Sequence, residues 1–225
     1  YRGADRAILV TDRKCAASDT LATSYILSCA IKKLDYDIIL CGRQAIDGDT
    51  AQVGPQIAEK LGVPQVTYIE KLNDLTESSI TIKRNIGNGW QEVKSSLPVL
   101  GTVIDEANFP RVAAAKKMMK YKNAMVESEV VKQVAADNPD ATDEEKAELT
   151  KLKCRTLKDA GLLIDQWDLD YLDADLQWCG RDGSPTKVHR IQSVVLEAKD
   201  SKQVEPNQAG IESMVHELIV DHTIG

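Results

Sequence analysis

The chain has 225 residues, of which 43% are hydrophobic and 28% are charged, a composition typical of a folded domain with appendages or of two small domains. With 28 Lys and Arg residues against 35 Asp and Glu residues, the formal net charge of −7 disfavours a broad nucleic-acid-binding surface. No run of about 18 apolar residues, the length that a membrane-spanning helix needs, occurs in the sequence. The five cysteines are odd in number and form no C-x-x-C pair, so we expect a reducing compartment and a cytoplasmic protein.

Apolar runs and amphipathic segments alternate in the first third of the chain. Apolar runs at 6–12, 37–41 and 65–69 predict strands, and apolar spacings typical of helices occur over 19–34 and 53–61. Because these strands are apolar throughout rather than at every second residue, we expect both of their faces to be covered. The order strand, helix, strand, helix, strand predicts a parallel α/β sheet.

The spacing of the apolar residues changes in the middle of the chain. Gly87-Asn88-Gly89 lies between two alternating runs and predicts a hairpin, and residues 97–104 form one more apolar run. Between 107 and 126 there are five cations and no acidic residue, which indicates a contact loop.

The last third is polar and rich in charge. A capping box at 142–145 predicts a charged helix, and Asn207 is expected to cap a final helix with an apolar stripe on one face. We expect this part of the chain to have no strand ladder of its own. The sequence therefore divides into an α/β domain at 1–125 and an extended C-terminal arm at 126–225.

The loop after the second strand is the first candidate ligand site. In an open parallel sheet, such a loop meets a helix N-terminus at the carboxyl ends of the strands, where free N–H groups favour an anion. Gly42 and Gly48 would let the backbone approach a ligand, while Asp47 or Asp49 could accept hydrogen bonds from ribose hydroxyls or cap the helix. An ordinary connection with capping residues is the alternative.

The opening turn of the helix at 19–34 is the second candidate. Thr20, Thr23 and Ser24 bring hydroxyl groups to the same end of the sheet, where they could contact a phosphate or a flavin, or serve as simple caps.

Side chains for catalysis or metal binding are not indicated. Neither G-x-G-x-x-G nor G-x-x-x-x-G-K-[ST] occurs, which disfavours a dehydrogenase fingerprint and a P-loop. His189, His216 and His222 all lie in the arm and share no helix face suited to a metal pair. Among the cysteines, only Cys15 has cationic neighbours of the kind that activate a thiolate. We expect no catalytic side chain and no metal site.

The sequence closely resembles the β subunit of electron-transfer flavoproteins from about residue 3 to 125. The resemblance is carried by Ala7-Ile-Leu-Val-Thr-Asp-Arg13, Asp19-Thr-Leu-Ala-Thr-Ser24 and Leu40-Cys-Gly-Arg-Gln-Ala-Ile-Asp-Gly-Asp-Thr-Ala-Gln-Val-Gly-Pro-Gln-Ile-Ala-Glu59. A further similar segment is Gly183-Ser-Pro-Thr-Lys-Val188, which resembles the family's motif before its C-terminal arm. The family's first strand and the loop after it have no counterpart here, so we expect the natural protein to begin earlier.

The resemblance implies a Rossmann-like fold and a partner α subunit that carries FAD. It also implies a second nucleotide in the β subunit, which is AMP in simple members and a second FAD, fed by NADH, in electron-bifurcating members. The Gly-Asp-Thr-Ala-Gln-Val-Gly form of the loop at 48–54 is more similar to the bacterial, often bifurcating, branch. An adenine-nucleotide hydrolase or a nucleotide-binding scaffold are the alternatives of other classes.

Nucleotide contact is carried over by resemblance to two segments. They comprise Gly42, Arg43, Gln44, Ala45, Ile46, Asp47, Gly48, Asp49, Thr50, Ala51, Gln52 and Val53, together with Asp19, Thr20 and Thr23.

The segment at 107–125 resembles the family's recognition loop, which docks on a flavin-dependent dehydrogenase. Ala115 stands where many members have a leucine anchor, and Lys116, Lys117 and Lys120 add positive charge. Because an apolar anchor commonly dominates such a contact, the alanine argues against docking on a standard acyl-CoA dehydrogenase. A dehydrogenase that acts on lactate or another hydroxy acid is the alternative partner.

Overall fold

The computed structural model describes residues 2–189 and 203–220. Contacts divide the chain into two units, one ending at Lys187 and one beginning at Val188. Within the described ranges, none of the helices combines the length and the apolarity that crossing a bilayer requires.

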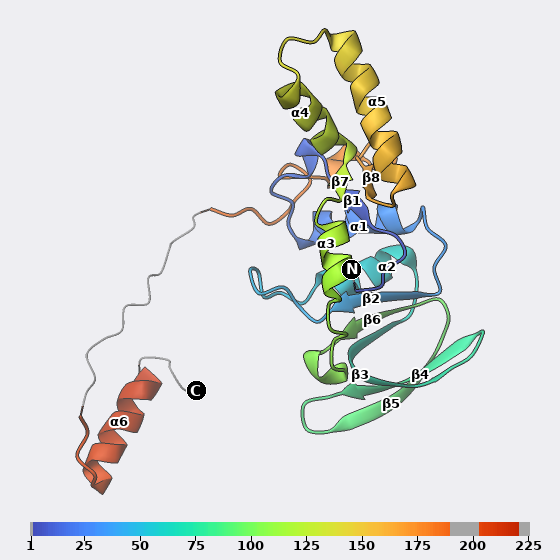
Figure 1. Cartoon of the computed structure of the whole chain (residues 1–225). Helices are drawn as coiled ribbons and strands as arrows, with labels where there is room; N and C mark the ends of the chain where they lie inside the picture. The colour runs from blue at the N-terminus through green and yellow to red at the C-terminus, as the bar shows by residue number, and fades with distance from the viewer. Residues whose placement is uncertain (1, 190–202, 221–225) are drawn as a thin grey trace. The chain divides into compact units, whose positions relative to one another are not determined.

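A five-stranded sheet forms the base of the first unit (Figure 1). Its order is β2 (Ile38–Gly42), β6 (Val99–Val103), β3 (Gln65–Leu75), β4 (Ser79–Asn85) and β5 (Trp90–Ser96). The β2–β6 and β6–β3 pairs are parallel, whereas β3–β4 and β4–β5 are antiparallel. This confirms the predicted α/β class with a parallel sheet and a hairpin.

The expectation that both faces of the runs at 6–12, 37–41 and 65–69 are covered is wrong, because Leu9, Leu40 and Tyr68 are exposed. The covered strand is β6, from the run at 97–104. The first four residues of β6 are buried, because β6 lies between β2 and β3 and is covered by α2 (Val53–Leu61). At the hairpin, Gly87 and Gly89 have φ angles of 84° and 149°, a region that favours glycine. The predicted turn residues therefore lie where the chain reverses between β4 and β5.

The first apolar run does not join this sheet. β1 (Ile8–Val10) pairs in parallel with β8 (Leu163–Trp167), which also pairs in parallel with β7 (Met125–Val126). The last third thus contributes one strand, β8, to a sheet whose other strands begin at Ile8 and Met125. Acidic residues obscured the strand in the sequence, since Asp165 interrupts its apolar run, yet Trp167 is buried.

One helix connects the two sheets. In α1 (Thr20–Ile31) buried residues alternate with partly exposed ones, because both sides of the helix are covered. Ile26 belongs to a core with Trp167 of β8, whereas Leu27 packs against a core that contains Leu100 of β6 and Ile57 of α2. The short 3₁₀ turn η1 (Arg13–Cys15) leads from β1 into this helix.

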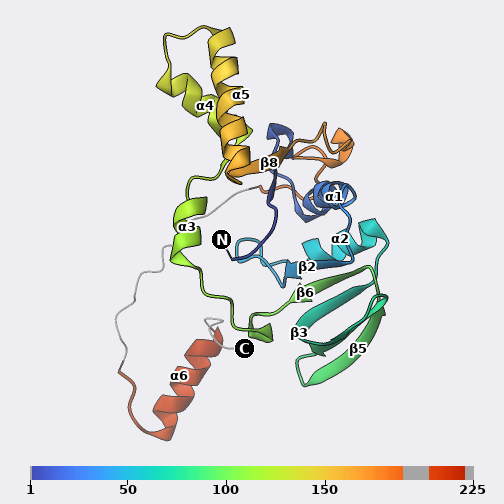
Figure 2. The same ribbon diagram turned by 45° about the vertical axis from the view of Figure 1, so that its right-hand side comes forward.

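A helical hairpin and two shorter elements complete the first unit. α4 (Glu127–Asp137) and α5 (Asp143–Asp159) lie side by side and contact β8 (Figure 2). The predicted capping box is confirmed, because the Glu145 N–H donates to Thr142 Oγ1 over 3.3 Å and the Thr142 N–H donates to Glu145 Oε2 over 2.8 Å. Hydrogen bonds from Thr142 lower the pKa of Glu145. The helix α3 (Ala115–Tyr121) precedes β7, and the 3₁₀ turn η3 (Leu176–Trp178) follows β8.

The described part of the second unit contains the predicted final helix, α6 (Gln208–Val220). Asn207 caps it, since its Oδ1 accepts a hydrogen bond of 2.8 Å from the Gly210 N–H. Ile211 and Ile219 are about half exposed, so the apolar stripe lies open in the described chain. His222, placed on this helix by the sequence, lies outside the described residues. That the arm packs on a partner subunit stays a prediction.

Candidate functional site

The predicted ligand-binding loop leaves the sheet at the carboxyl edge of its parallel strands. The backbone register places Gly42, Val103 and Ile69 in one row across β2, β6 and β3. Residue 43 is the first beyond this row, and the loop continues to α2. The loop therefore lies at the edge where open parallel sheets bind their ligands.

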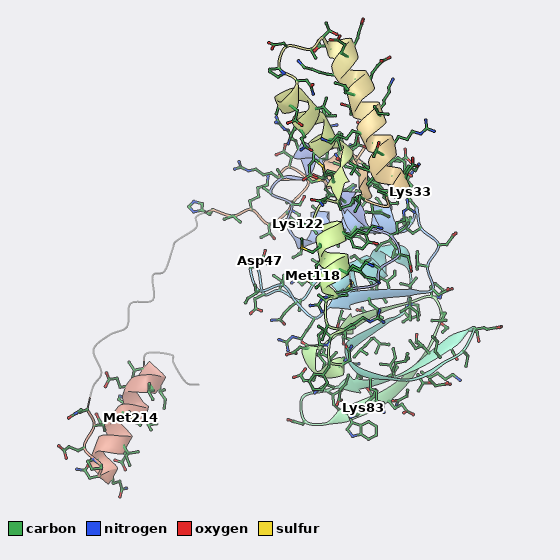
Figure 3. The ribbon with its side chains drawn as sticks, viewed as in Figure 1. Lys33, Asp47, Lys83, Met118, Lys122 and Met214 are labelled. Atoms are coloured by element: carbon green, nitrogen blue, oxygen red, sulfur yellow. The ribbon has the colours of Figure 1, made fainter. Side chains whose placement is uncertain are left out.

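The loop is open to solvent and held by its own polar groups. Every residue from Gly42 to Thr50 is exposed, including Asp47, which Figure 3 labels. The Gln44 amide donates to Asp49 Oδ1, and the Asp49 N–H donates to the Ala45 carbonyl over 3.0 Å. Asp49 and Ala51 have left-handed φ angles of 51° and 53°, a conformation that costs energy for residues other than glycine. Such strain is concentrated at functional sites, which favours a binding loop over an ordinary connection.

The N-terminus of α2 points at the end of this loop without a side-chain cap. The N-cap residue is Gln52, whose side chain makes no capping hydrogen bond, and Pro55 lies in the first turn, where no N–H is required. A Cβ atom at Gly54 would lie 3.0 Å from Thr102 Cγ2, so glycine lets the helix approach β6 closely. The first-turn N–H groups, which are those of Val53 and Gly54 because Pro55 has none, and the helix dipole favour an anion at this end.

Asp19 acts as the cap of α1 and ties it to a distant segment. Its Oδ1 accepts from the Ala22 N–H over 2.9 Å and its Oδ2 accepts from the Thr186 N–H over 3.0 Å. The Asp19 N–H donates to Ser184 Oγ over 2.8 Å, and Ser184 is buried. Burial alone would raise the pKa of Asp19, but its hydrogen-bond donors together lower it. The Gly183–Val188 motif therefore fixes the start of α1.

A hydrogen bond joins the two predicted segments. Thr20 Oγ1, in the first turn of α1, donates to Gln52 Oε1 at the start of α2 over 2.9 Å. Thr23 lies one turn further along α1, where its N–H donates to the Asp19 carbonyl. The structure thus brings the 42–53 loop and the 19–23 turn together, although their contact with a nucleotide stays a prediction.

A hollow of about 540 Å³ opens at the same edge, and sequence reasoning missed most of its lining. It is formed by Arg43, Tyr68, Arg84, Asn85, Ile86, Gly87, Ile104 and Glu106. Of these residues, only Arg43 was predicted to contact a ligand. The positions of the others depend on strand register, and an arginine at the end of a strand is no signal by itself.

The surroundings of Cys15 do not favour a thiolate. Burial, and then the charge of Asp12, raise the pKa of Cys15, so its cationic neighbours do not make it a thiolate. Burial also raises the pKa of Cys41, and it raises that of Cys179 to about 11. In residues 2–189 and 203–220, no group of three or more His, Cys, Asp or Glu side chains is placed to hold a metal ion.

Comparison with known sequences decides the family. Residues 1–135 match the family model of the electron transfer flavoprotein domain, which is more than half of the 225 residues. The chain belongs to the electron transfer flavoprotein family.

Its relatives include β subunits of this family. The chain is 36% identical over 222 residues to the electron transfer flavoprotein subunit beta of Clostridium acetobutylicum, which covers 99% of the chain and 71% of that relative. It is 50% identical over 121 residues to the subunit beta of Thermoanaerobacterium thermosaccharolyticum, covering 54% of the chain and 46% of the relative. It is 49% identical over 125 residues to the acryloyl-CoA reductase electron transfer subunit gamma of Anaerotignum propionicum, covering 52% of the chain and 45% of the relative. The chain spans about half the length of the last two relatives, and its resemblance to an electron transfer flavoprotein β subunit is confirmed.

The segment that resembles the recognition loop is exposed in the structure. Ala115 is the first residue of α3, and Lys116, Lys117 and Lys120 are all exposed on that helix. Met118, labelled in Figure 3, is exposed as well, and Phe109 before the helix is fully exposed. The segment is therefore available for contact, and the identity of its partner stays a prediction.

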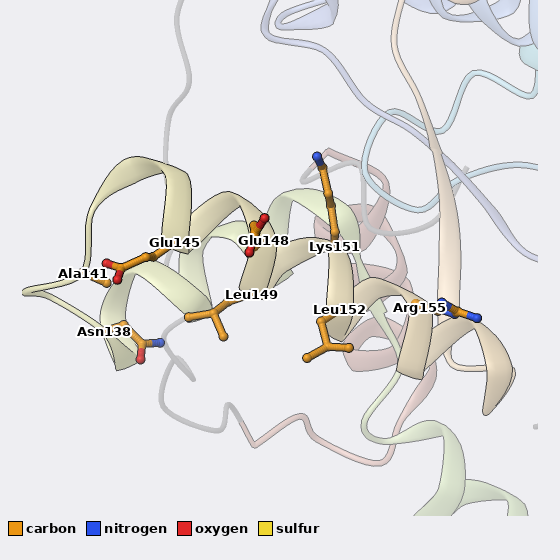
Figure 4. Close-up of a pocket in the computed structure, with 8 residues that line it drawn as sticks. All are labelled: Asn138, Ala141, Glu145, Glu148, Leu149, Lys151, Leu152 and Arg155. Atoms are coloured by element: carbon orange, nitrogen blue, oxygen red, sulfur yellow. The ribbon is translucent and has the colours of Figure 1, made fainter.

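A larger hollow lies elsewhere, on the α4–α5 hairpin (Figure 4). It measures about 800 Å³ and is lined by Leu149 and Leu152 among the charged side chains of Glu148, Lys151 and Arg155. Most of its lining comes from one helix, α5, and none of it comes from the strand ends. Its size therefore does not make it the nucleotide site.

Proposed function

We propose that this chain is the nucleotide-holding β subunit of an electron transfer flavoprotein that pairs with an FAD-carrying α subunit. In this proposal it helps to pass electrons from NADH to a flavin-dependent dehydrogenase in the cytoplasm. The hydrogen bond between Thr20 and Gln52 is the observation that carries the proposal. It joins the two segments that resemble the family's nucleotide-binding segments, at one edge of the sheet.

The residues at this edge fit an adenine nucleotide. At the uncapped N-terminus of α2 the N–H groups of Val53 and Gly54 could meet a phosphate, and the hydroxyl of Thr50 lies in the adjoining loop. Asp47 uses Oδ1 to accept the Gly48 N–H over 2.9 Å, and Asp49 uses Oδ1 for the Gln44 amide. Each carboxylate thus keeps a second oxygen for a ribose hydroxyl.

These polar groups can bind a nucleotide, and the redox chemistry would come from the nucleotide itself. If the nucleotide is FAD, it supplies electron exchange with NADH, whereas AMP would be structural. In either case the chain binds and orients the nucleotide, and Asp19 with Ser184 fixes the turn from which Thr20 projects.

If the nucleotide of this subunit is FAD, we propose that the complex carries out electron bifurcation, in which electrons from NADH are divided between two acceptors. The resemblance of the 48–54 loop to the bacterial branch supports it. The alternative is a single-flavin shuttle with structural AMP. The dehydrogenase is of the acyl-CoA or the hydroxy-acid type, and the name of the acryloyl-CoA reductase subunit favours the former.

Anaerobic titration of the purified α/β complex with NADH tests the proposal. Bleaching of the visible flavin absorbance by NADH supports electron entry through this complex. Bleaching only by a reduced dehydrogenase would support the single-flavin shuttle. A complex without flavin that hydrolyses ATP would refute both.

A further inference from the structure

The helix α5 has an open face with apolar side chains near its middle. None of the 17 residues of this fully described helix is buried. Leu149 is 38% exposed and Leu152 is 63% exposed, and both line the hollow of about 800 Å³. Figure 4 shows these two side chains pointing to the same side of the helix. Neighbouring exposed leucines that border a hollow are typical of a contact surface.

The helix α4 covers an adjacent side of α5 and leaves this face free. Lys153 Nζ donates to Gln133 Oε1 of α4 over 2.8 Å, and it lies 4.0 Å from Asp137 Oδ2. Figures 1 and 2 show the hairpin at the end of the first unit away from the five-stranded sheet. A macromolecule can therefore reach the open face of α5 without displacing the 42–53 loop.

The charges of α5 are divided along its length. Residues 143–148 contain four acidic residues and one lysine, whereas residues 151–158 contain four cations and no acidic residue. The helix dipole favours this order by itself, but it does not account for the exposed leucines between the two halves. Glu148 lines one part of the hollow, and Lys151 and Arg155 line the other. Among the described residues, these three side chains take part in no ion pair.

A face with this order of charges is complementary to a second copy of itself. If two copies of α5 cross antiparallel about a two-fold axis between Leu149 and Leu152, the leucines of both copies meet at the centre. Glu148 of each copy then faces Lys151 and Arg155 of the other. A parallel crossing would instead place like charges opposite each other, which is destabilising. The charges therefore select one orientation, and the leucines supply the apolar contact.

We propose that the open face of α5 is a self-association surface, through which two copies of this chain, each in its own α/β complex, form an antiparallel two-fold dimer. A helix of 17 residues is about 25 Å long, so a contact made by α5 alone is small and the dimer is reversible. This association needs neither nucleotide binding nor electron transfer, so it goes beyond the proposed function and does not depend on it.

Sedimentation velocity of the α/β complex at rising concentration, up to about 0.1 mM, tests the proposal. We expect one heterodimer at low concentration and two associated heterodimers at high concentration. Leu152→Ser should weaken the association by about tenfold or more, because it removes the apolar centre. Glu148→Lys should also weaken it, because lysine then faces Lys151 and Arg155. Glu77→Lys, the same change at an exposed position between β3 and β4, is the matched control and should sediment as the wild type does.

A mixture of two variants tests the charge pairing itself. Lys151→Glu alone should associate weakly, because the new glutamate faces Glu148 of the other copy. Mixed in equal amounts, the Lys151→Glu and Glu148→Lys complexes should associate with each other more tightly than either does with itself, since opposite charges face each other again. A fold defect in either variant would not produce this recovery.

Three outcomes would overturn the proposal. The first is a wild-type complex that remains a single heterodimer at every concentration. The second is an association that Leu152→Ser and Glu148→Lys leave unchanged, or a variant mixture that does not recover it. The third is loss of the α subunit from Leu152→Ser with circular dichroism unchanged, which would show that this face binds the α subunit. Self-association in a complex that NADH does not reduce would support the dimer and count against the proposed function.

Discussion

Replacing Ser184 by alanine should loosen the start of α1 without changing the surface of the protein. Ser184 is 2% exposed, and its hydroxyl accepts from the Asp19 N–H over 2.8 Å and donates to the Gly180 carbonyl over 2.6 Å. The substitution leaves both backbone groups without this partner. A buried group left unsatisfied costs about 1–3 kcal/mol, and because the two share one hydroxyl we expect a loss of about 2 kcal/mol in the free energy of unfolding.

Urea unfolding of the purified subunit measures this loss. Ser96→Ala, an exposed position on β5, is the matched control and should change the free energy of unfolding by less than about 0.5 kcal/mol. In the α/β complex, Ser184→Ala should also release its nucleotide faster, because Thr20 and Gln52 are then held less firmly. If Ser184→Ala unfolds at the same urea concentration as Ser96→Ala, the tie between the 183–188 motif and α1 does not contribute as argued.

Other perturbations test the remaining parts of the site. The lowered pKa of Asp19 means that its carboxylate stabilises the fold above the ordinary aspartate range, and that this contribution is lost as the pH falls below about 4. Asp19→Asn should therefore be less stable than the wild type at neutral pH and approach it in acid, as measured by unfolding at several pH values. Asp49→Ala combined with Thr50→Ala should reduce the nucleotide that stays bound through gel filtration, and an unchanged content would contradict the loop assignment. Reversing the three lysines of α3 to glutamate should slow electron delivery to the dehydrogenase at low salt by about tenfold with the flavin content unchanged, whereas a rate insensitive to both charge and salt would exclude α3 as the docking surface.

The five-stranded sheet was predictable because its signals are local. Continuous apolar runs marked β2, β6 and the start of β3, and the Gly87-Asn88-Gly89 turn marked the hairpin. The three-stranded sheet was not predictable in this way. Its strands are as short as two residues, and β1 pairs with Asp165 and Trp167 from the other end of the unit. A strand of that length has no measurable period, and its partner is fixed by tertiary packing around α1.

The candidate site divides in the same manner. The 42–53 loop and the cap at Asp19 were accessible from sequence, since helix starts and glycine-containing loops have local signatures. The positions of Ser184 and Arg84 were not. Ser184 meets α1 only through a contact across 165 residues, and Arg84 reaches the ligand edge through the register of β3 and β4.

The nucleotide content of the intact α/β complex tests the central claim most directly. Acid releases bound nucleotides, which are then quantified as FAD and AMP for each heterodimer. If the edge between α1 and α2 holds a nucleotide, the complex contains one nucleotide beyond the FAD of the α subunit, and a second FAD with no AMP would indicate bifurcation. A complex with one FAD and no second nucleotide would contradict the assignment of the 42–53 loop and the 19–23 turn.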